Sequence, residues 1–335
     1  WRIPSGCCSA NRINLHVWQC EKSMMTYYMG GISFVIPVYR SAGCLTELYG
    51  RICDVFDKSV HRFEVLFVED CGGDGSWDVI KQIATTDPRV RGFKMSRNFG
   101  QHNAILCGVR EARYDVIVTL DDDLQHPPEV IPQLIERLDD RTDVVYGPPQ
   151  SERHGILRDL ASQFTKLALK EFIGAENARN VSALRVFRTR LRESFANYKG
   201  PTVNLDVLLS WGTNRFTNLK VRHDPRSCGM SGYTFVKLMA HALNMITGFS
   251  AKPLQMASAL GFLSSLFGLL VLIFVLGRWI LAGSVVPGFA FLASIVAIFS
   301  GTQLLALGIM GEYMARMHFR TMDQPTYVIG EVTKS

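Results

Sequence analysis

Three successive carboxylates, Asp121 to Asp123, follow an apolar run in the stretch VTLDDDLQHPPEV, residues 118 to 130. Asp121 and Asp123 have a D-x-D spacing, so on a turn after a strand both side chains can point at one ion. Carboxylate oxygens suit Mg²⁺ or Mn²⁺, and these ions usually take substrate phosphates as further ligands. The pair therefore predicts a site for a divalent cation and a nucleotide diphosphate.

An acidic start of a helix is the alternative explanation, because negative charge is favourable at a helix N-terminus near Pro127 or Pro128. We prefer this alternative, or an outward-facing role, for Asp122. Neither a Walker glycine loop nor a G-x-G-x-x-G follows the first expected strand, which argues against a P-loop NTPase or a dinucleotide oxidoreductase. The net charge of +6 is modest, and no basic run is interleaved with aromatics, so nucleic acid is not an expected partner.

Short β-branched runs alternate with helix-compatible segments from residue 31 onward. The runs are ISFVIPV (32 to 38), FEVLFVED (63 to 70), VRGFKMS (90 to 96), DVIVTL (115 to 120) and DVVYG (143 to 147). Strands separated by helices of this length indicate βαβ units and a mostly parallel sheet with both faces covered.

Ligands of such sheets bind beyond the carboxyl ends of the strands. Three of the expected strands have polar or aromatic residues at this end. These residues are Pro37 and Tyr39, Glu69 and Asp70, and Asp121 and Asp123. We expect all three strand ends to meet in one crevice.

The C-terminal part is apolar enough for lipid. The chain is 47% hydrophobic with a mean hydropathy of +0.11, and residues 254 to 276 carry no charge, while residues 285 to 310 repeat the pattern. Each segment can cross a hydrocarbon core of about 30 Å as a helix, and the pair predicts a hairpin; a buried soluble helix is the alternative. Lys252, Arg316 and Arg320 lie at the open end, so the positive-inside bias places the N-terminal domain in the cytoplasm.

The first 30 residues show neither sustained periodicity nor a signal-peptide layout, and we expect them to lie outside the fold. The eight cysteines show no C-x-x-C pair and no metal-ligand spacing. Free thiols in a reducing compartment are the simplest interpretation.

Four motifs in order and spacing, VIPVYR, VEDCGGDGSWD, MSRNFGQHNAILCG and LDDDLQHPPE, resemble glycosyltransferase family 2. The last two resemble its polyisoprenyl-phosphate branch, and GIMGEYMARMHFRTMDQPTYVI is similar to the tail of bacterial members that charge undecaprenyl phosphate with a sugar. The resemblance implies a type-A glycosyltransferase fold, which is Rossmann-like, followed by a two-helix transmembrane hairpin. It also implies a UDP- or GDP-sugar donor, Mg²⁺ or Mn²⁺, and inverting transfer to a polyisoprenyl phosphate at the inner membrane.

The resemblance also implies roles for individual residues on the donor side. Pro37 and Tyr39 match residues around the nucleotide base, and Glu69 stands where an Asp usually contacts it. Asp121, Asp123 and Gln125 match the ligands of the metal and the diphosphate. Arg40 and Ser41 depart from the usual P-V-Y-N-E continuation, which puts one nucleotide contact in doubt.

Two arginines match family positions that neutralise phosphate by charge-assisted hydrogen bonds, Arg185 in SALRVFRTR and Arg226 in RSCGMSGY. Surface or snorkelling arginines are the alternative. Gly232 replaces a lysine of the family motif, and ARNVSALR lacks the acidic residue often found before the arginine that Arg185 matches. A phosphate monoester has its second pKa near 6, so the acceptor does not require deprotonation by a base.

The acceptor is a lipid, so the site must meet the membrane. Residues 155 to 172 have apolar residues at helical spacing, as in an interfacial amphipathic helix, and Arg153 with Arg158 could guide the lipid phosphate; a core-packing helix is equally periodic. A second candidate is residues 233 to 249, which lead into the first apolar segment.

The predicted organisation is an extension (1 to 30), a cytoplasmic glycosyltransferase domain (31 to 232), a juxtamembrane helix (233 to 252), two transmembrane helices (253 to 311) and a cytoplasmic tail (312 to 335). Three other classes remain open: a processive polysaccharide synthase, a non-catalytic nucleotide-sugar-binding membrane protein, and a transporter. The first lacks a Q-x-x-R-W sequence, and the last lacks intramembrane charge. The sequence leaves the sugar unspecified, and it is compatible with a homo-oligomer.

Overall fold

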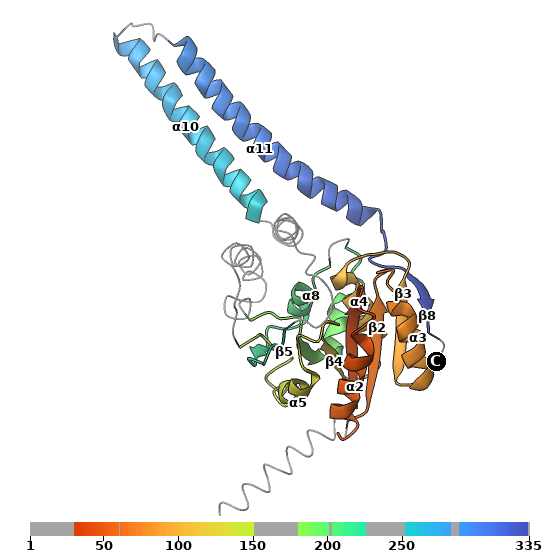
Figure 1. Ribbon diagram of the computed structural model, residues 1–335. Helices are drawn as coiled ribbons and strands as arrows, with labels where there is room; N and C mark the ends of the chain where they lie inside the picture. Colours follow the sequence, from red (N-terminus) through yellow and green to blue (C-terminus); the bar gives the residue numbers. More distant parts are fainter. Residues whose placement is uncertain are drawn as a thin grey trace, which may run out of the picture.

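The computed structural model describes residues 30–59, 61–150, 180–200, 203–225, 252–282 and 288–333. They form an α/β part from which a pair of long helices projects (Figure 1). This arrangement confirms the predicted fold class, a mostly parallel sheet with helices followed by a helical hairpin.

One eight-stranded sheet forms the centre of the α/β part, with the order β7-β5-β6-β4-β1-β2-β3-β8. Five strands lie within a residue of the predicted runs: β1 (Ile32–Val38), β2 (Phe63–Glu69), β3 (Val90–Met95), β4 (Val116–Thr119) and β5 (Val144–Tyr146). Three strands were not predicted, β6 (Arg185–Arg188), β7 (Phe216–Asn218) and β8 (Ile329–Val332). β6 runs antiparallel between β4 and β5, and β8 runs antiparallel to β3, so the sheet is mixed.

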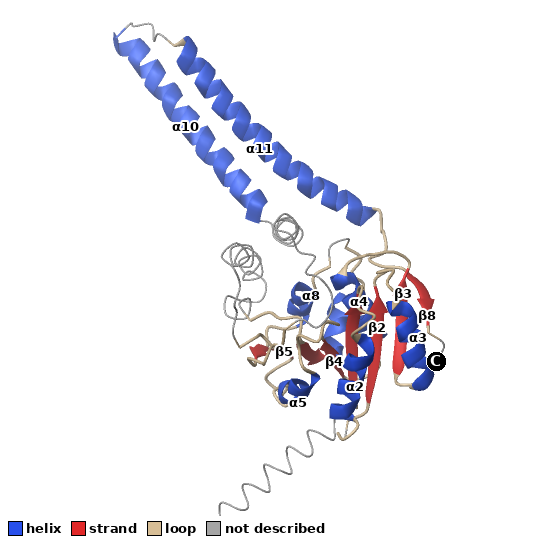
Figure 2. Cartoon of the chain, viewed as in Figure 1, coloured by secondary structure: helices blue, strands red, loops and turns tan. Residues whose placement is uncertain are grey.

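Helices cover both faces of the sheet (Figure 2). The helical elements of this part are α2 (Leu45–Phe56), α3 (Ser76–Thr86), α4 (Gln101–Glu111), η1 (Pro128–Val130), α5 (Ile131–Ile135), η2 (Thr189–Phe195) and α8 (Leu205–Gly212). Every residue of β1 and β2 is buried, as expected for central parallel strands that read as continuous apolar runs.

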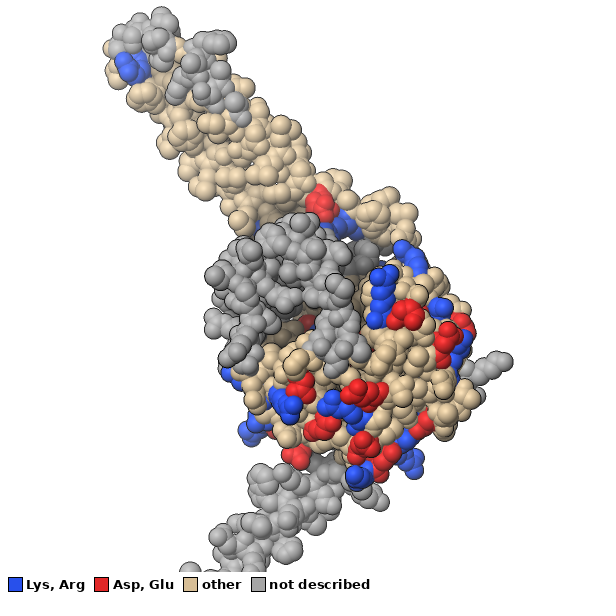
Figure 3. All heavy atoms as spheres, in the orientation of Figure 1, with Lys and Arg blue, Asp and Glu red and all other residues tan. Residues whose placement is uncertain are grey.

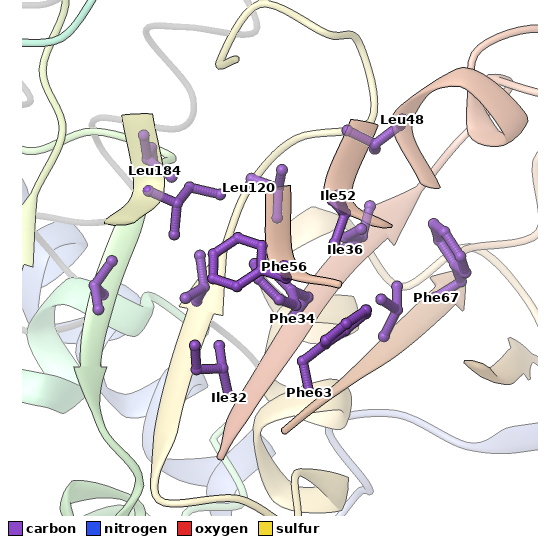
Figure 4. Close-up of a cluster of buried hydrophobic side chains, with 14 of the residues drawn as sticks. Ile32, Phe34, Ile36, Leu48, Ile52, Phe56, Phe63, Phe67, Leu120 and Leu184 are labelled. Carbon is purple, nitrogen blue, oxygen red and sulfur yellow. The ribbon is translucent and has the colours of Figure 1, made fainter. Parts of the chain in front are cut away.

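The core is divided by the sheet into two clusters. On the α2 face the rings of Phe34, Phe56 and Phe63 pack edge to face or tilted, with centroids 4.9 to 6.1 Å apart (Figure 4). On the opposite face Val35 and Phe187 pack with residues of α4 and α8. Because neighbouring residues of β1 point to opposite faces, Phe34 and Val35 belong to different clusters.

The hairpin consists of α10 (Lys252–Ala282) and α11 (Phe289–Thr321). Along its middle, Figure 3 shows no Lys, Arg, Asp or Glu, whereas the α/β part is covered with both signs of charge. Within α10, Lys252–Arg278 is long and apolar enough to cross a membrane, with a hydropathy of 2.6. The second span stays a prediction, and α11 continues ten residues past the predicted end at 311, to Thr321.

The segment after α11, within the predicted tail, returns to the sheet. β8 pairs with β3, and the Gly92 amide donates to Thr333 Oγ1 at 2.9 Å. Lys199 and Asp323 form an ion pair at 2.8 Å next to the end of α11. The chain after the hairpin is therefore fixed to the α/β part by strand pairing and by an ion pair.

Among the cysteines, the prediction of free thiols is wrong for Cys44, which is disulfide-bonded. Cys53, Cys71 and Cys107 are free.

The packing of α4 on β1 gives a test of the fold. A Cβ on Gly108 would lie 2.4 Å from Val35 Cγ1, whereas a Cβ on Gly50, in α2, would meet nothing within 4 Å. Alanine favours a helix over glycine by about 1 kcal/mol, but overpacking a core costs about 1 to 3 kcal/mol. We expect Gly108→Ala to lower the free energy of unfolding and Gly50→Ala to raise it, measured by denaturant titration of the full chain in detergent. The same sign for both variants would contradict this packing.

Candidate functional site

The carboxyl ends of β1, β2 and β4 lie together on the side of the sheet from which the hairpin projects (Figure 1). In the register, Val38 pairs with Glu69 and Val35 pairs with Thr119. The residues that follow these strands therefore share one edge, as expected of a parallel sheet, and the crevice at this edge stays a prediction.

The loops after β1 and β2 contact each other. Arg40 Nε donates to the Gly72 carbonyl at 3.1 Å, and the Arg40 guanidinium lies 5.3 Å from the centre of the Tyr39 ring. A Cβ on Gly72 would lie 2.7 Å from the Arg40 amide nitrogen, so glycine permits this close approach. Arg40, which departs from the family motif, joins the two loops, and Tyr39 remains 47% exposed beside them.

Pro37 and Glu69 are buried at the same end of the sheet. Glu69 Oε1 accepts a hydrogen bond from the Gly72 amide at 2.6 Å. Its Oε2 is buried and has no hydrogen-bond partner in the part of the chain that the structure describes. A buried oxygen without a donor costs about 1 to 3 kcal/mol, so this atom can accept a donor from a ligand.

Asp70 holds the start of α4, a role that the sequence did not reveal. Its carboxylate accepts hydrogen bonds from the Phe99 and Gly100 amides at 2.7 and 2.8 Å. Burial raises the pKa of Asp70, and the two backbone hydrogen bonds oppose this effect. The contact fixes the N-terminus of α4, where Gln101 is the first helical residue.

The three carboxylates after β4 point in different directions. Asp121 Oδ1 accepts a hydrogen bond from Gln101 Nε2 at 2.7 Å, and Asp123 Oδ1 accepts one from the Gln125 amide at 3.1 Å. Asp122 Oδ2 accepts one from the Tyr39 amide at 3.0 Å, and burial raises the pKa of Asp122. The outward-facing role expected for Asp122 is therefore wrong, because this side chain connects the turn to the loop after β1.

The chemistry of this turn fits a hard cation that brings ligands of its own. Asp121 and Asp123 offer carboxylate oxygens, and Gln125 offers an amide oxygen two residues further on. Among the described residues, no group of three or more His, Cys, Asp or Glu side chains is arranged to hold a metal ion. Mg²⁺ and Mn²⁺ do not need such a group, because phosphates and water complete their coordination.

Arg185, at the start of β6, is held by the protein and is only 4% exposed. Its Nε and Nη2 donate to the two carboxylate oxygens of Asp206 at 2.7 and 3.0 Å. Its Nη1 lies 3.4 Å from Thr119 Oγ1 and 3.2 Å from the Ala183 carbonyl. All three side-chain nitrogens of Arg185 thus have partners within the protein, and its role as a phosphate ligand stays a prediction.

His126, directly after Gln125, is buried with an exposure of 6%. Its Nε2 lies 3.4 Å from Ser182 Oγ, and its ring contacts that of His223 edge to face at 4.9 Å. Burial lowers the pKa of His126 to about 3, with further lowering by His223 and Arg185. The imidazole is therefore neutral at physiological pH.

The remaining predicted site residues, Arg153, Arg158 and Arg226, lie outside the described residues, as do both candidate amphipathic segments. Sequence reasoning missed Gln101 and Asp206. Gln101 lies inside the motif MSRNFGQHNAILCG, so the motif was a signal for it. Asp206 lies in LDVLLSWG, where nothing but its position in an apolar helix could have drawn attention to it.

Comparisons with known proteins agree with this geometry. A family model described as glycosyl transferase family 2 matches residues 33–197. The chain is 32% identical over 300 residues to the uncharacterized glycosyltransferase YkcC of Bacillus subtilis (strain 168), covering 89% of this chain and 92% of that protein. It is 31% identical over 311 residues to the undecaprenyl-phosphate 4-deoxy-4-formamido-L-arabinose transferase of Shewanella sediminis (strain HAW-EB3), covering 90% and 94%.

Among solved structures, glucosyl-3-phosphoglycerate synthase from Mycobacterium tuberculosis in complex with phosphoglyceric acid has a TM-score of 0.50 at 17% identity, covering 67% of this chain and 80% of that chain. Its complex with Mn²⁺, UDP-glucose and phosphoglyceric acid also has a TM-score of 0.50, at 16% identity, covering 74% and 84%. At this identity the likeness shows the fold, and it confirms the predicted type-A architecture.

The buried neutral His126 predicts a pH dependence of stability. Its folded pKa of about 3 lies below the ordinary value of 6.5, so between these values only the unfolded chain takes up the proton. Stability therefore falls as the pH drops below about 6.5. Between pH 7 and pH 5 we expect the free energy of unfolding to fall by about 2 kcal/mol more in the wild type than in His126→Gln. Denaturant titrations at both pH values measure this difference, and parallel losses in the two proteins would show that His126 is not buried in the neutral form.

Proposed function

The chain belongs to glycosyltransferase family 2, and on this basis we propose that it transfers a sugar from a UDP- or GDP-sugar to a polyisoprenyl phosphate, undecaprenyl phosphate in a bacterial cell. That the protein is a glycosyltransferase follows from its family. The lipid acceptor is supported by relatives named undecaprenyl-phosphate 4-deoxy-4-formamido-L-arabinose transferase, two of which are 31% and 30% identical over at least 90% of this chain. Because the match leaves out at most about a tenth of this chain, it includes part of the helical hairpin, which a water-soluble acceptor would not require.

The donor base is proposed to lie between the loops after β1 and β2. Tyr39 offers an exposed aromatic ring, and Glu69 Oε2 offers a buried acceptor that has no partner among the described residues. Uracil and guanine both carry ring N–H donors that can satisfy this oxygen. Pro37 and the contact between Arg40 and Gly72 fix the shape of the two loops.

The donor diphosphate is proposed to lie over the turn after β4, where Asp121, Asp123 and Gln125 would hold Mg²⁺ or Mn²⁺. Such an ion supplies a Lewis acid that stabilises the charge developing on the leaving nucleoside diphosphate. The protein itself orients the two carboxylates that would bind the ion. Gln101 donates a hydrogen bond to Asp121, and the backbone amide of Gln125 donates one to Asp123.

The acceptor phosphate is proposed to be the nucleophile, attacking the anomeric carbon in line and inverting it. Arg226, Arg153 and Arg158 would guide this phosphate, and the buried Arg185, whose charge is largely compensated by Asp206, would add a weaker attraction. A catalytic base is not required, because a phosphate monoester is already anionic at neutral pH. The apolar hairpin would place the protein in the inner membrane as a multi-pass protein, with the catalytic domain in the cytoplasm, for the modification of envelope glycans or lipids.

A transfer assay tests the proposed function. We expect the purified full chain in detergent to move label from a UDP- or GDP-sugar to undecaprenyl phosphate, and we expect excess chelator to stop this reaction. Asp123→Ala should abolish transfer, because it removes a hard ligand that faces the diphosphate, whereas Asp54→Ala, at an exposed carboxylate on α2, should retain it. Both variants should unfold at wild-type temperatures. Full turnover in chelator would contradict the metal role, and no transfer with any donor would leave a non-catalytic binding protein as the function.

The acceptor chemistry makes a separate prediction. If the nucleophile is the lipid phosphate, the rate should fall as the pH drops through roughly 6, because the phosphate loses its second charge there. Undecaprenol, which has a hydroxyl in place of the phosphate, should accept no sugar. The measurement is the initial rate from pH 5 to 8 with each acceptor at saturating donor. Equal rates with undecaprenol and its phosphate would show that the enzyme deprotonates its acceptor.

A further inference from the structure

Although the stretch ARNVSALR has no acidic residue before Arg185, the fold pairs Arg185 with an acidic residue from a different element. Asp206, in the first turn of α8, forms two hydrogen bonds with the Arg185 guanidinium at 2.7 and 3.0 Å. Both side chains are buried, with exposures of 4% for Arg185 and 2% for Asp206. Tyr146, in β5, donates its hydroxyl to Asp206 Oδ1 at 3.1 Å, so three elements meet at one buried carboxylate.

This buried pair lies directly below the acidic turn. Arg185 pairs in register with Thr119, the last residue of β4, and its Nη1 lies 3.4 Å from Thr119 Oγ1. Asp121 follows two residues after Thr119. Burial lowers the pKa of Arg185, but Asp206 raises it, with smaller contributions from Tyr146 and Asp121. The positive charge of Arg185 therefore acts on the carboxylate that would hold the cation.

Asp206 is not placed to act as a base. Both of its carboxylate oxygens are hydrogen-bonded to Arg185, and one also accepts from Tyr146. It is almost completely enclosed, so an acceptor phosphate cannot reach it. Its effect on the reaction must pass through Arg185.

We propose that Asp206 is a positioning residue that fixes Arg185 below the Asp121 turn and cancels most of its charge, so that the turn can bind a divalent cation together with the donor diphosphate. This inference rests on the proposed nucleotide-sugar site. An uncompensated Arg185 would repel the cation and attract the diphosphate, because unit charges interact strongly where burial lowers the effective dielectric constant. Asp206 thereby sets the balance between cation binding and anion binding.

The charge-removing variant Asp206→Asn tests this proposal by binding rather than turnover. We expect this variant to weaken Mn²⁺ binding about tenfold in the presence of nucleotide, because the uncompensated charge of Arg185 repels the cation. We expect the same charge to tighten metal-free nucleotide binding several-fold. Both measurements use the full chain in detergent. Electron paramagnetic resonance measures the concentration of free Mn²⁺, and calorimetry measures the affinity for UDP and for GDP. Tyr146→Phe keeps the ion pair and removes only one hydrogen bond, so it should change either affinity less than about twofold.

A second variant keeps the proposal testable if Asp206→Asn does not fold, since an unpaired buried arginine is strongly destabilising. The double variant Arg185→Met with Asp206→Leu replaces the pair by apolar side chains, which buried pairs often tolerate. It should fold and bind Mn²⁺ within about threefold of the wild type, because no charge is left uncompensated.

Two results would overturn the proposal: loss of Mn²⁺ binding in the double variant, or equal weakening of Mn²⁺ and nucleotide binding in Asp206→Asn with a lower unfolding temperature. A wild type that binds neither UDP nor GDP would also overturn it. A wild type that binds them but transfers no sugar to undecaprenyl phosphate would instead count against the proposed function alone.

Discussion

The shape of the site depends on carboxylates that are held by backbone amides. Glu69 accepts from the Gly72 amide, Asp70 from the Phe99 and Gly100 amides, and Asp122 from the Tyr39 amide. Each contact fixes a loop at the carboxyl edge of the sheet, and together they join the ends of β1, β2, β3 and β4. Hydrogen bonds to ionised groups are stronger than neutral ones, so much negative charge is accommodated there without an equal number of basic side chains. Of these carboxylates, Glu69 has one buried oxygen, Oε2, that no group in the described residues satisfies and that a ligand can reach as an acceptor.

The sequence predicted the parts of the fold that depend on local pattern. β1, β2 and β4 are mainly apolar runs that are buried at every residue, whereas β3 is partly exposed at Arg91 and Lys94; the polar residues after each run mark its end. β6 was not predicted because its four residues, RVFR, carry two arginines, and only its position between β4 and β5 makes it a strand. β7 and β8 are also short, and they are strands because they pair with segments that are distant in the sequence.

The candidate site also has features that the local sequence predicted and features that it did not. The placement of Asp121 and Asp123 after a strand could be predicted, since the residues and the strand are adjacent in sequence. The partner of Arg185 could not, because Asp206 follows it by 21 residues and reaches it from a helix on one face of the sheet. The direction of Asp122 was also not predictable, as it depends on the Tyr39 amide 83 residues earlier. Long-range contacts of single polar side chains leave no periodic signal in a sequence.

The return of the chain to β3 after the hairpin has a consequence for biosynthesis. The Gly92 amide and Thr333, which hydrogen-bond to each other, are 241 residues apart. A ribosome releases the chain from its N-terminus, so β3 is complete long before its neighbour β8 has been translated. Until then β3 has an open edge, and an open edge can pair with the wrong segment or another chain. The edge of the sheet at β3 is therefore closed only after the hairpin, which precedes β8 in the chain, has been translated.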